Sequence, residues 1–224
     1  MRIIEHFFGL LAPHDCLNCG REGSLLCSDC SAINLESVPE RCYYCYRASS
    51  NSTTCPACRH YSVLKHVWVR SDYTKTAKQL VHALKFNFAK DAAGQIAKEL
   101  QKVLPSINEN TVIVHVPAAS SHVRRRGFDQ SALIARELSH LLGLPHVHGL
   151  SRIGQQHQVG ATAETRRKQM KEAFRSVSTP VIDGMQVLLV DDVLTTGSTL
   201  EAAALALRRA GAKSVSAVCF AQAK

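Results

Sequence analysis

A strand, a pair of acids and a helix follow one another near the end of the chain. Residues 187–190 form a continuous apolar run, which is typical of a strand buried on both faces of a parallel sheet. Asp191 and Asp192 come next, at the carboxyl end of this strand, where open α/β sheets bind their ligands. Residues 200–210 then predict a helix that Gly211 ends. The stretch therefore predicts an α/β fold with a parallel sheet and a binding site after this strand.

The turn between the acids and the helix is small and rich in hydroxyl groups. Gly197 lets the backbone approach a ligand closely. Free N–H groups at the helix start, with the positive end of the helix dipole, favour a phosphate group. The two carboxylates can accept hydrogen bonds from vicinal sugar hydroxyls. The pattern predicts a holder for a ribose 5-phosphate made by Asp191, Asp192, Thr195, Thr196, Gly197, Ser198 and Thr199.

An apolar strand followed by two acids also occurs in magnesium-binding strands of NTPases and in phospho-acceptor pockets. An NTPase should also carry Gly-x-x-x-x-Gly-Lys-Ser/Thr, and this chain has no Gly-Lys pair. A dinucleotide-binding fold should carry Gly-x-Gly-x-x-Gly, which is absent too. The stretch resembles the PRPP-binding motif of type I phosphoribosyltransferases. That resemblance implies that Asp191 and Asp192 hold the ribose hydroxyls and that residues 195–199 wrap the 5-phosphate.

Eight of the nine cysteines fall into four Cys-x-x-Cys pairs. Two such turns complete a tetrahedral metal site, so the pairs predict two structural zinc sites, each with four cysteine ligands, in a double zinc ribbon. Disulfides are one competing interpretation, which a cytosolic setting and the pairwise spacing disfavour. A thioredoxin-like redox pair is another, and four such pairs exceed what redox chemistry needs. We prefer the arrangement in which two consecutive Cys-x-x-Cys pairs bind the same ion, and an interleaved arrangement stays open. The predicted ligands are Cys16, Cys19, Cys27, Cys30, Cys42, Cys45, Cys55 and Cys58.

Charge and hydropathy bound the remaining function classes. No stretch approaches the ~20 apolar residues that span a bilayer, so we expect a cytoplasmic protein. Residues 1–11 predict a short amphipathic helix rather than a cleaved signal. The formal net charge is +9, and residues 66–224 supply all of it, with 21 Lys/Arg against 12 Asp/Glu. A polyanion is therefore a reasonable partner for this part of the chain, although proteins that bind small phosphates often carry a similar excess.

After the cysteines the pattern changes to alternating strands and helices, so we expect a zinc-ribbon module over residues 1–65 and a phosphoribosyltransferase-like domain over 66–224. Cys219 is expected to be a buried core residue. The expected strands and helices are strands at 67–69 and 112–116 and helices at 76–88, 91–104 and 131–142.

Two further segments suggest contacts with phosphate groups. Lys78, His82 and Lys85 share one helix face, which is either simply solvated or a basic rim over the site. Residues 121–130 predict a basic loop that could close over a pyrophosphate as a mobile flap. The pyrophosphate and flap candidates are Lys85, Pro117, Ala118, Ala119, Arg126 and Gly127.

Together these motifs resemble the ComF family, which includes the competence protein ComFC and GntX-like proteins. The resemblance rests on the paired cysteine ribbon, on Lys85, on Arg-Gly-Phe-Asp-Gln at 126–130 and on the motif at 191–199. It extends over nearly the whole chain through Arg152, Gln158, Arg166 and Ala173-Phe174.

Three positions depart from the family pattern. His115 replaces the first proline of Val-Pro-Val-Pro, and Gln169 replaces the asparagine of Arg-x-x-Asn. Asp129 replaces the asparagine of Arg-Gly-Phe-Asn-Gln, which adds a negative charge beside the flap and weakens the expectation of tight pyrophosphate binding there.

The segment from Arg152 to Arg175 resembles a basic helix, which suits either nucleic acid or plain exposure to solvent. No aromatic residue lies among its charges before Phe174, so we expect contacts to phosphates rather than base stacking. The candidates for DNA contact are Arg124, Arg125, Arg166, Arg167, Lys168 and Lys171.

The resemblance implies a competence protein that acts in natural transformation and helps to bring single-stranded DNA into the cytoplasm beside a ComFA-like helicase. A second hypothesis is an active phosphoribosyltransferase that uses PRPP and Mg²⁺, although no segment identifies an acceptor pocket. A third is a regulator that senses PRPP and binds nucleic acid. These three hypotheses share one PRPP site and differ in the second ligand.

Overall fold

The computed structural model describes residues 14–86, 89–153, 173–177 and 179–223. The predicted N-terminal helix at 1–11 and the candidates Gln158, Arg166, Arg167, Lys168, Gln169 and Lys171 lie outside these ranges. In chain order the elements are α2 (Ser28–Asn34), the 3-10 helices η1 (Ser50–Ser52) and η2 (Pro56–Cys58), β1 (Leu64–Asp72), α3 (Lys75–Phe86), α4 (Ala89–Gln101), β2 (Thr111–His115), α5 (Ser120–Arg126), α6 (Gln130–Leu142), β3 (His146–Val147), β4 (Leu150–Arg152), β5 (Phe174–Ser176), α8 (Thr179–Ile182), β6 (Gln186–Leu194), α9 (Ser198–Arg209) and β7 (Ser214–Gln222).

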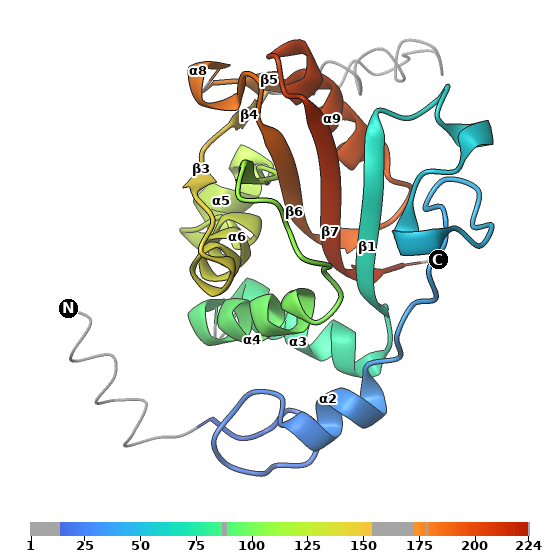
Figure 1. Ribbon diagram of the computed structural model, residues 1–224. Helices are drawn as coiled ribbons and strands as arrows, with labels where there is room; N and C mark the ends of the chain where they lie inside the picture. Colours follow the sequence, from blue (N-terminus) through green and yellow to red (C-terminus); the bar gives the residue numbers. More distant parts are fainter. Residues whose placement is uncertain (1–13, 87–88, 154–172, 178, 224) are drawn as a thin grey trace, which may run out of the picture.

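Five strands form one parallel sheet in the order β1-β7-β6-β2-β3 (Figure 1). β6 lies at its centre, and residues 187–190 are buried, as their continuous apolar run predicts. Because all five strands run the same way, their carboxyl ends lie at one edge of the sheet. The predicted α/β fold with a parallel sheet is confirmed. β4 and β5 form a separate antiparallel pair.

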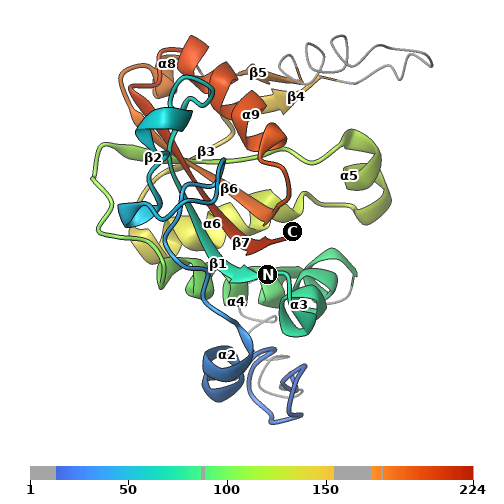
Figure 2. The ribbon, with the colours of Figure 1, turned by 90° about the vertical axis from the view of Figure 1, so that its right-hand side faces the viewer.

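Helices cover both faces of the sheet, as buried parallel strands require. Leu188 and Val190 of β6 share a cluster with α3, α4 and α6, whereas Val187 and Leu189 share another with α9. Figure 2 shows α9 on one side of the strands and α4 on the other. Cys219 of β7 is fully buried in the α9 cluster, which confirms the expectation for the ninth cysteine.

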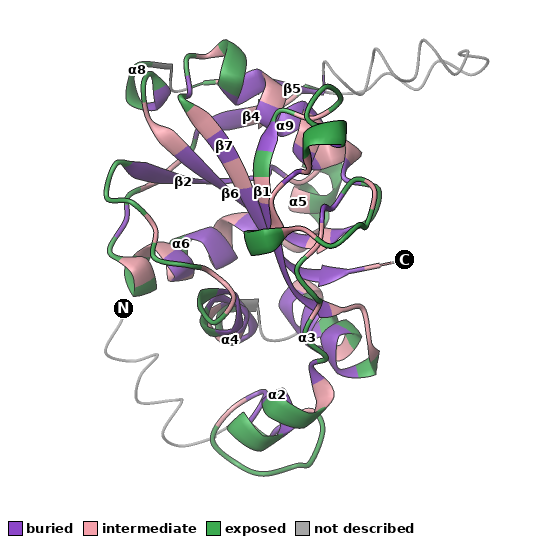
Figure 3. Ribbon diagram, turned by 45° about the vertical axis from the view of Figure 1, so that its right-hand side comes forward, coloured by how far each residue is buried: buried purple, intermediate pink, exposed green. Residues whose placement is uncertain are grey.

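The cysteine pairs form two small units, which we call the first knuckle (residues 14–36) and the second knuckle (residues 40–62). In the first knuckle, α2 is largely exposed and buries Cys30 and Ser31 (Figure 3). The Ser31 hydroxyl donates to Glu99 Oε1 of α4 at 2.6 Å, and Arg70 Nε of β1 donates to Glu99 Oε2 at 2.9 Å. This buried carboxylate therefore joins the first knuckle to the main sheet.

The second knuckle lies at the β1 edge of the sheet. The Thr54 amide donates to the Lys65 carbonyl at 3.0 Å, and the Trp68 indole N–H donates to Asn51 Oδ1 at 2.9 Å. The main sheet begins at Leu64, immediately after this knuckle. Both knuckles contact the main sheet. The domain boundary expected near residue 65 stays a prediction.

Several elements differ from their sequence-based expectations. The short strand expected at 67–69 is the nine-residue strand β1, and the helix expected to reach 104 ends at Gln101. The basic stretch expected as a loop forms α5, which ends where Gly127 adopts a left-handed conformation with φ 80°. Arg152 and Arg175, expected in a basic helix, lie in paired strands β4 and β5. For the strands, pairing with distant segments decides the structure over local periodicity, and α5 ends at a glycine cap.

Candidate functional site

The two carboxylates lie near the carboxyl end of β6, where their charges interact. The Ser131 hydroxyl of α6 donates to Asp191 Oδ1 at 3.0 Å, and the Asp192 amide donates to the same oxygen at 2.9 Å. Burial and the neighbouring Asp192 carboxylate nevertheless raise the pKa of Asp191 well above its ordinary value. The pair therefore favours a cation or a hydrogen-bond donor as its ligand.

Lys85 supplies a positive charge to this pair. It lies in the last turn of α3, and its Nζ is 2.8 Å from Asp192 Oδ2. Both side chains are mostly shielded from solvent, with exposed fractions of 23% for Lys85 and 10% for Asp192. The structure thus brings together one of the predicted pyrophosphate contacts and one of the predicted ribose contacts.

The predicted phosphate loop joins β6 to α9. Thr195 and Thr196 are exposed, and Gly197 adopts φ 78° immediately before the first residue of α9. The Thr196 and Ser198 hydroxyls lie 2.9 Å apart, so both face the same exposed turn. A helix start that is preceded by glycine and lined by hydroxyls has the donors that bind a phosphate. Thr199, also predicted, lies in the first turn of α9.

The second knuckle packs against this loop and against the first turn of α9. The sequence did not predict this contact. A Cβ added at Gly197 would lie 2.7 Å from Tyr43 Cε2, so the tyrosine ring lies directly against the glycine. The Tyr43 and Ser62 hydroxyls donate to Glu201 in the first turn of α9, and the Val63 amide donates to the same carboxylate at 3.2 Å. Burial and the Glu201 hydrogen bond raise the pKa of Tyr43, which keeps its hydroxyl protonated as a donor.

Replacing Gly197 with alanine is expected to destabilise the protein by about 2–3 kcal/mol, because it adds a clash with Tyr43 to the strain of a positive φ. Gly143 is the matched control, since it has φ 66° and open space around its Cα. Gly143→Ala should therefore show the strain alone. Urea unfolding of the two variants measures the difference, and equal losses of stability would show that the Tyr43 contact is unimportant.

The flap candidate Arg126 and the DNA-contact candidates Arg124 and Arg125 all lie on α5. Arg126 extends back to α3, where its guanidinium lies 5.6 Å from the Phe86 ring centroid, and it donates to Gln130 Oε1 at 2.9 Å. Arg126 therefore lies at the same end of α3 as Lys85. Arg124 and Arg125 are exposed on α5 and remain available to an external ligand.

Asp129 acts as a helix cap. Its Oδ1 accepts from the amides of Ser131 and Ala132 at the start of α6, and its Oδ2 accepts from the Ala118 amide at 2.8 Å. The Ala118 amide, expected to face a phosphate, is thus already hydrogen-bonded, while the backbone of Pro117 and Ala119 leads into α5. The Asp129 carboxylate, expected as a negative charge beside the flap, accepts hydrogen bonds from these three backbone amides.

His115, another departure from the family pattern, is buried at the β2–β3 edge and contacts His146 and the exposed His148. Its Nδ1 lies 3.0 Å from His146 Nε2, and its ring centroid lies 5.2 Å from that of His148. Burial, with the charges of His146 and His148, lowers the pKa of His115 to about 3. His115 is therefore neutral at physiological pH and fills the space beside the sheet without adding charge.

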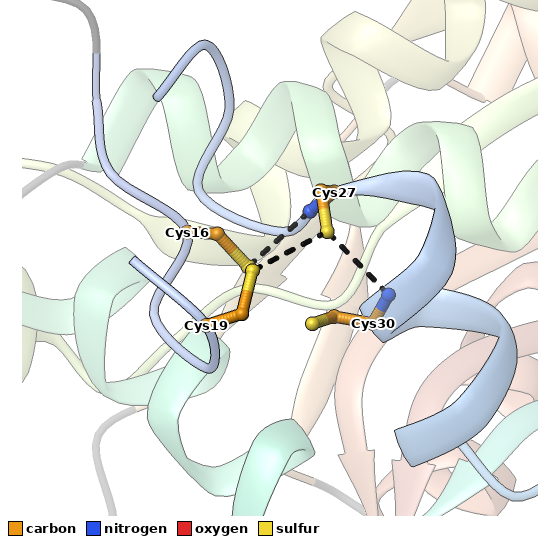
Figure 4. A group of neighbouring side chains, drawn as sticks. All are labelled: Cys16, Cys19, Cys27 and Cys30. Atoms are coloured by element: carbon orange, nitrogen blue, oxygen red, sulfur yellow. Dashed lines mark hydrogen bonds between the residues drawn. The ribbon is translucent and has the colours of Figure 1, made fainter. Parts of the chain in front are cut away.

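The eight paired cysteines gather into two groups within the described residues. Consecutive pairs share each group, Cys16/Cys19/Cys27/Cys30 and Cys42/Cys45/Cys55/Cys58, with ligand atoms within 4.8 Å of one another. The four side chains of the first group point toward one another from two turns (Figure 4). The structure thus has the preferred sequential arrangement, and the interleaved one does not occur.

The cysteine geometry fits a tetrahedral thiolate site. The Cys19–Cys27 sulfurs lie 3.7 Å apart and the Cys45–Cys55 sulfurs 3.6 Å apart. Zinc–sulfur bonds of ~2.3 Å in a tetrahedron separate sulfurs by ~3.8 Å, close to both values. Although burial opposes ionisation, backbone amides lower the pKa of Cys16 to about 6. Despite a hydrogen bond from Asn18, burial and the other three thiols raise the pKa of Cys30 to about 12, so the support for a metal site comes from the geometry of the sulfurs. Both groups could therefore hold a zinc ion.

Comparison with known proteins places this site in a family. Residues 123–224 match the phosphoribosyl transferase domain. The chain is 38% identical over 160 residues to DNA utilization protein YhgH of Salmonella typhi, covering 67% of this chain and 69% of that protein. It is 31% identical over 206 residues to the Escherichia coli K12 protein of the same name, covering 80% and 88%. The chain belongs to the ComF family.

One further relative and one solved structure are also similar to the chain. Competence protein F of Haemophilus influenzae is 36% identical over 106 residues, which is 46% of each chain. Among solved structures, the allosteric regulatory enzyme of purine biosynthesis matches 58% of this chain, at 23% identity, with a TM-score of 0.42 and 25% of its own length covered. The predicted family is confirmed by the relatives, and the predicted fold class by the parallel sheet and its flanking helices. The ligand roles of the ComF-family residues stay predictions.

Proposed function

We propose that this ComF-family chain binds PRPP or a related nucleotide at the β6–α9 turn and handles single-stranded DNA in the cytoplasm during natural transformation. The observation that supports PRPP or nucleotide binding is the cluster of Asp191, Asp192 and Lys85 beside the start of α9, which follows Gly197. The role in handling DNA is supported by the names of the relatives, which refer to DNA utilization and competence.

Each group has a chemical task in this proposal. Asp191 and Asp192 accept hydrogen bonds from the ribose hydroxyls, and the turn at 195–199 donates to the 5-phosphate. Lys85 balances the acid pair and meets the pyrophosphate. Mg²⁺, when bound with PRPP, neutralises phosphate charge, and carboxylates suit this hard cation. Zinc in both knuckles holds the module together.

The proposed partner is a ComFA-like helicase, beside which the chain would receive the incoming strand. This partner is supported by the competence names of the relatives. Within the described residues no helix has the length and apolarity to cross a membrane.

Calorimetric titration of the zinc-loaded chain with PRPP and Mg²⁺, repeated with single-stranded DNA present, tests this proposal. We expect PRPP to bind and DNA to change its affinity, because the exposed arginines of α5 follow the strand next to β6. DNA binding without PRPP binding would remove the ribose-phosphate role. PRPP binding that DNA leaves unchanged, with no DNA binding of its own, would remove the DNA role.

An active phosphoribosyltransferase is the second candidate. The observation that favours it is that two cations, Lys85 and Arg126, reach the same end of α3 and could stabilise a departing pyrophosphate. Release of pyrophosphate on incubation with PRPP and a set of free bases, absent from an Asp191→Asn/Asp192→Asn variant, would establish turnover. No release with any base would leave binding as the role of the site.

A further inference from the structure

The second knuckle presents an aromatic surface that neither the metal site nor the phosphate site uses. Tyr61 is 71% exposed and Tyr44 is 49% exposed, which is unusual for large aromatic rings. Their rings are stacked, with centroids 6.0 Å apart and planes inclined by 12°. Tyr44 lies within the turn between Cys42 and Cys45, and Tyr61 follows the turn that ends at Cys58, so the second group of four cysteines places both rings together.

The two knuckles differ sharply in charge and in aromatic content. The second knuckle has three arginines and one acid, Glu40, whereas the first has one arginine and four acids. The first knuckle contains no Phe, Trp or Tyr. Zinc with four thiolates would add about −2 to each. Arg47 and Arg59 are exposed on the second knuckle, close in sequence to the stacked rings. With zinc bound, the second knuckle is formally about neutral and the first is about −5, so the second repels an anionic, aromatic ligand far less than the first does.

This surface also continues toward the phosphate site. The Tyr44 ring meets the Tyr43 ring edge-to-face, with centroids 6.2 Å apart and planes at 88°. Tyr43 in turn lies against Gly197 of the phosphate loop. A chain of bases and phosphates that contacts Tyr44 would therefore lie near the start of α9.

We propose that Tyr44 and Tyr61 form a stacking platform for the bases of single-stranded nucleic acid, with Arg47 and Arg59 contacting its phosphates. Aromatic rings beside cations are the features that bind single strands without sequence preference, because every base offers a π-face. A protein partner is less favoured, because Val63 is the one exposed large aliphatic residue among residues 40–63, and it is only 38% exposed. The proposal rests on the DNA-handling role proposed above and adds the surface that performs it.

Fluorescence anisotropy of the zinc-loaded full chain tests the platform with two labelled probes, an oligothymidylate and an abasic strand of equal length. We expect the wild type to prefer the strand with bases. Tyr44→Ala/Tyr61→Ala should weaken binding to that strand by about tenfold and remove the preference. Tyr44→Phe/Tyr61→Phe should keep it, since the rings remain. The salt dependence should not change in either variant, because no charge is altered.

Ile33→Ala is the matched control, because Ile33 is 76% exposed on the other knuckle and should not affect either probe. Zinc content measured on each variant verifies that the knuckle is intact. If the Ala variant keeps the preference for bases, or if the wild type has none, the platform is wrong while DNA binding stands. That result would leave a protein partner as the ligand of this surface. If the wild type binds neither probe yet binds PRPP, the DNA role and the platform both fall.

Discussion

Removing zinc is expected to unfold both knuckles and to loosen the phosphate loop. Structural zinc sites contribute ~10–16 kcal/mol of apparent binding free energy, which exceeds the contribution of the few side-chain hydrogen bonds that join each knuckle to the main sheet. The loop should follow because the second knuckle supplies the Tyr43 and Val63 contacts to Gly197 and Glu201. Hydrogen exchange of residues 195–199, before and after chelation and again after zinc is restored, measures the effect.

Single substitutions separate the two knuckles. Cys42→Ser disrupts the second knuckle and should weaken PRPP binding. Cys16→Ser disrupts the first knuckle and should leave PRPP binding unchanged, because that knuckle contacts α4 rather than the loop. Cys219→Ala removes a thiol outside both groups and should leave the zinc content unchanged. If neither chelation nor Cys42→Ser changes hydrogen exchange at residues 195–199, the contacts of the second knuckle with Gly197 and Glu201 do not stabilise the phosphate loop.

Replacing Asp191 and Asp192 together with asparagine is expected to abolish PRPP binding and to leave the fold intact. The change removes the charges proposed to hold the ribose and its Mg²⁺, and it leaves Lys85 without its carboxylate partner. Stability should change little, because the amides are isosteric and the repulsion that raises the pKa of Asp191 disappears. Calorimetry with PRPP and Mg²⁺ measures binding, and thermal unfolding measures stability.

Asp29→Asn provides the control, since Asp29 is an exposed carboxylate on the first knuckle that pairs with Arg21. It should bind PRPP as the wild type does. Undiminished PRPP binding by the double variant would move the site away from β6. Loss of both binding and thermal stability would assign the acid pair a role in folding.

The parts of the site that depend on short-range patterns could be predicted from the sequence. The apolar run before Asp191 indicated β6, and Gly211 marked the end of the following helix region. The spacing of the cysteines predicted two groups of four, because each turn can present only its own pair to one ion.

Contacts between distant segments could not be predicted. Nothing near Tyr43 in the sequence indicates that it packs on Gly197, and Ser131 gives no local sign of its bond to Asp191. Asp129 looked like a charge beside a flap, but it caps α6, because a side-chain cap depends on where the helix starts. The helix α5 was missed because seven residues with three adjacent arginines show no apolar period.

The pairing of β1 with β7 determines the order in which this protein can assemble on the ribosome. Leu64 of β1 lies beside Val215 of β7, so the first strand of the sheet waits for the last one to be synthesised. All eight paired cysteines precede β1 and can bind metal while the rest of the chain is still emerging. Contacts so distant in sequence form slowly and expose strand edges meanwhile. A second knuckle that has already taken up its metal can cover the outer edge of β1 during this delay, as the Thr54 amide does when it donates to the Lys65 carbonyl, whereas the edge that pairs with β7 stays open until the end of synthesis.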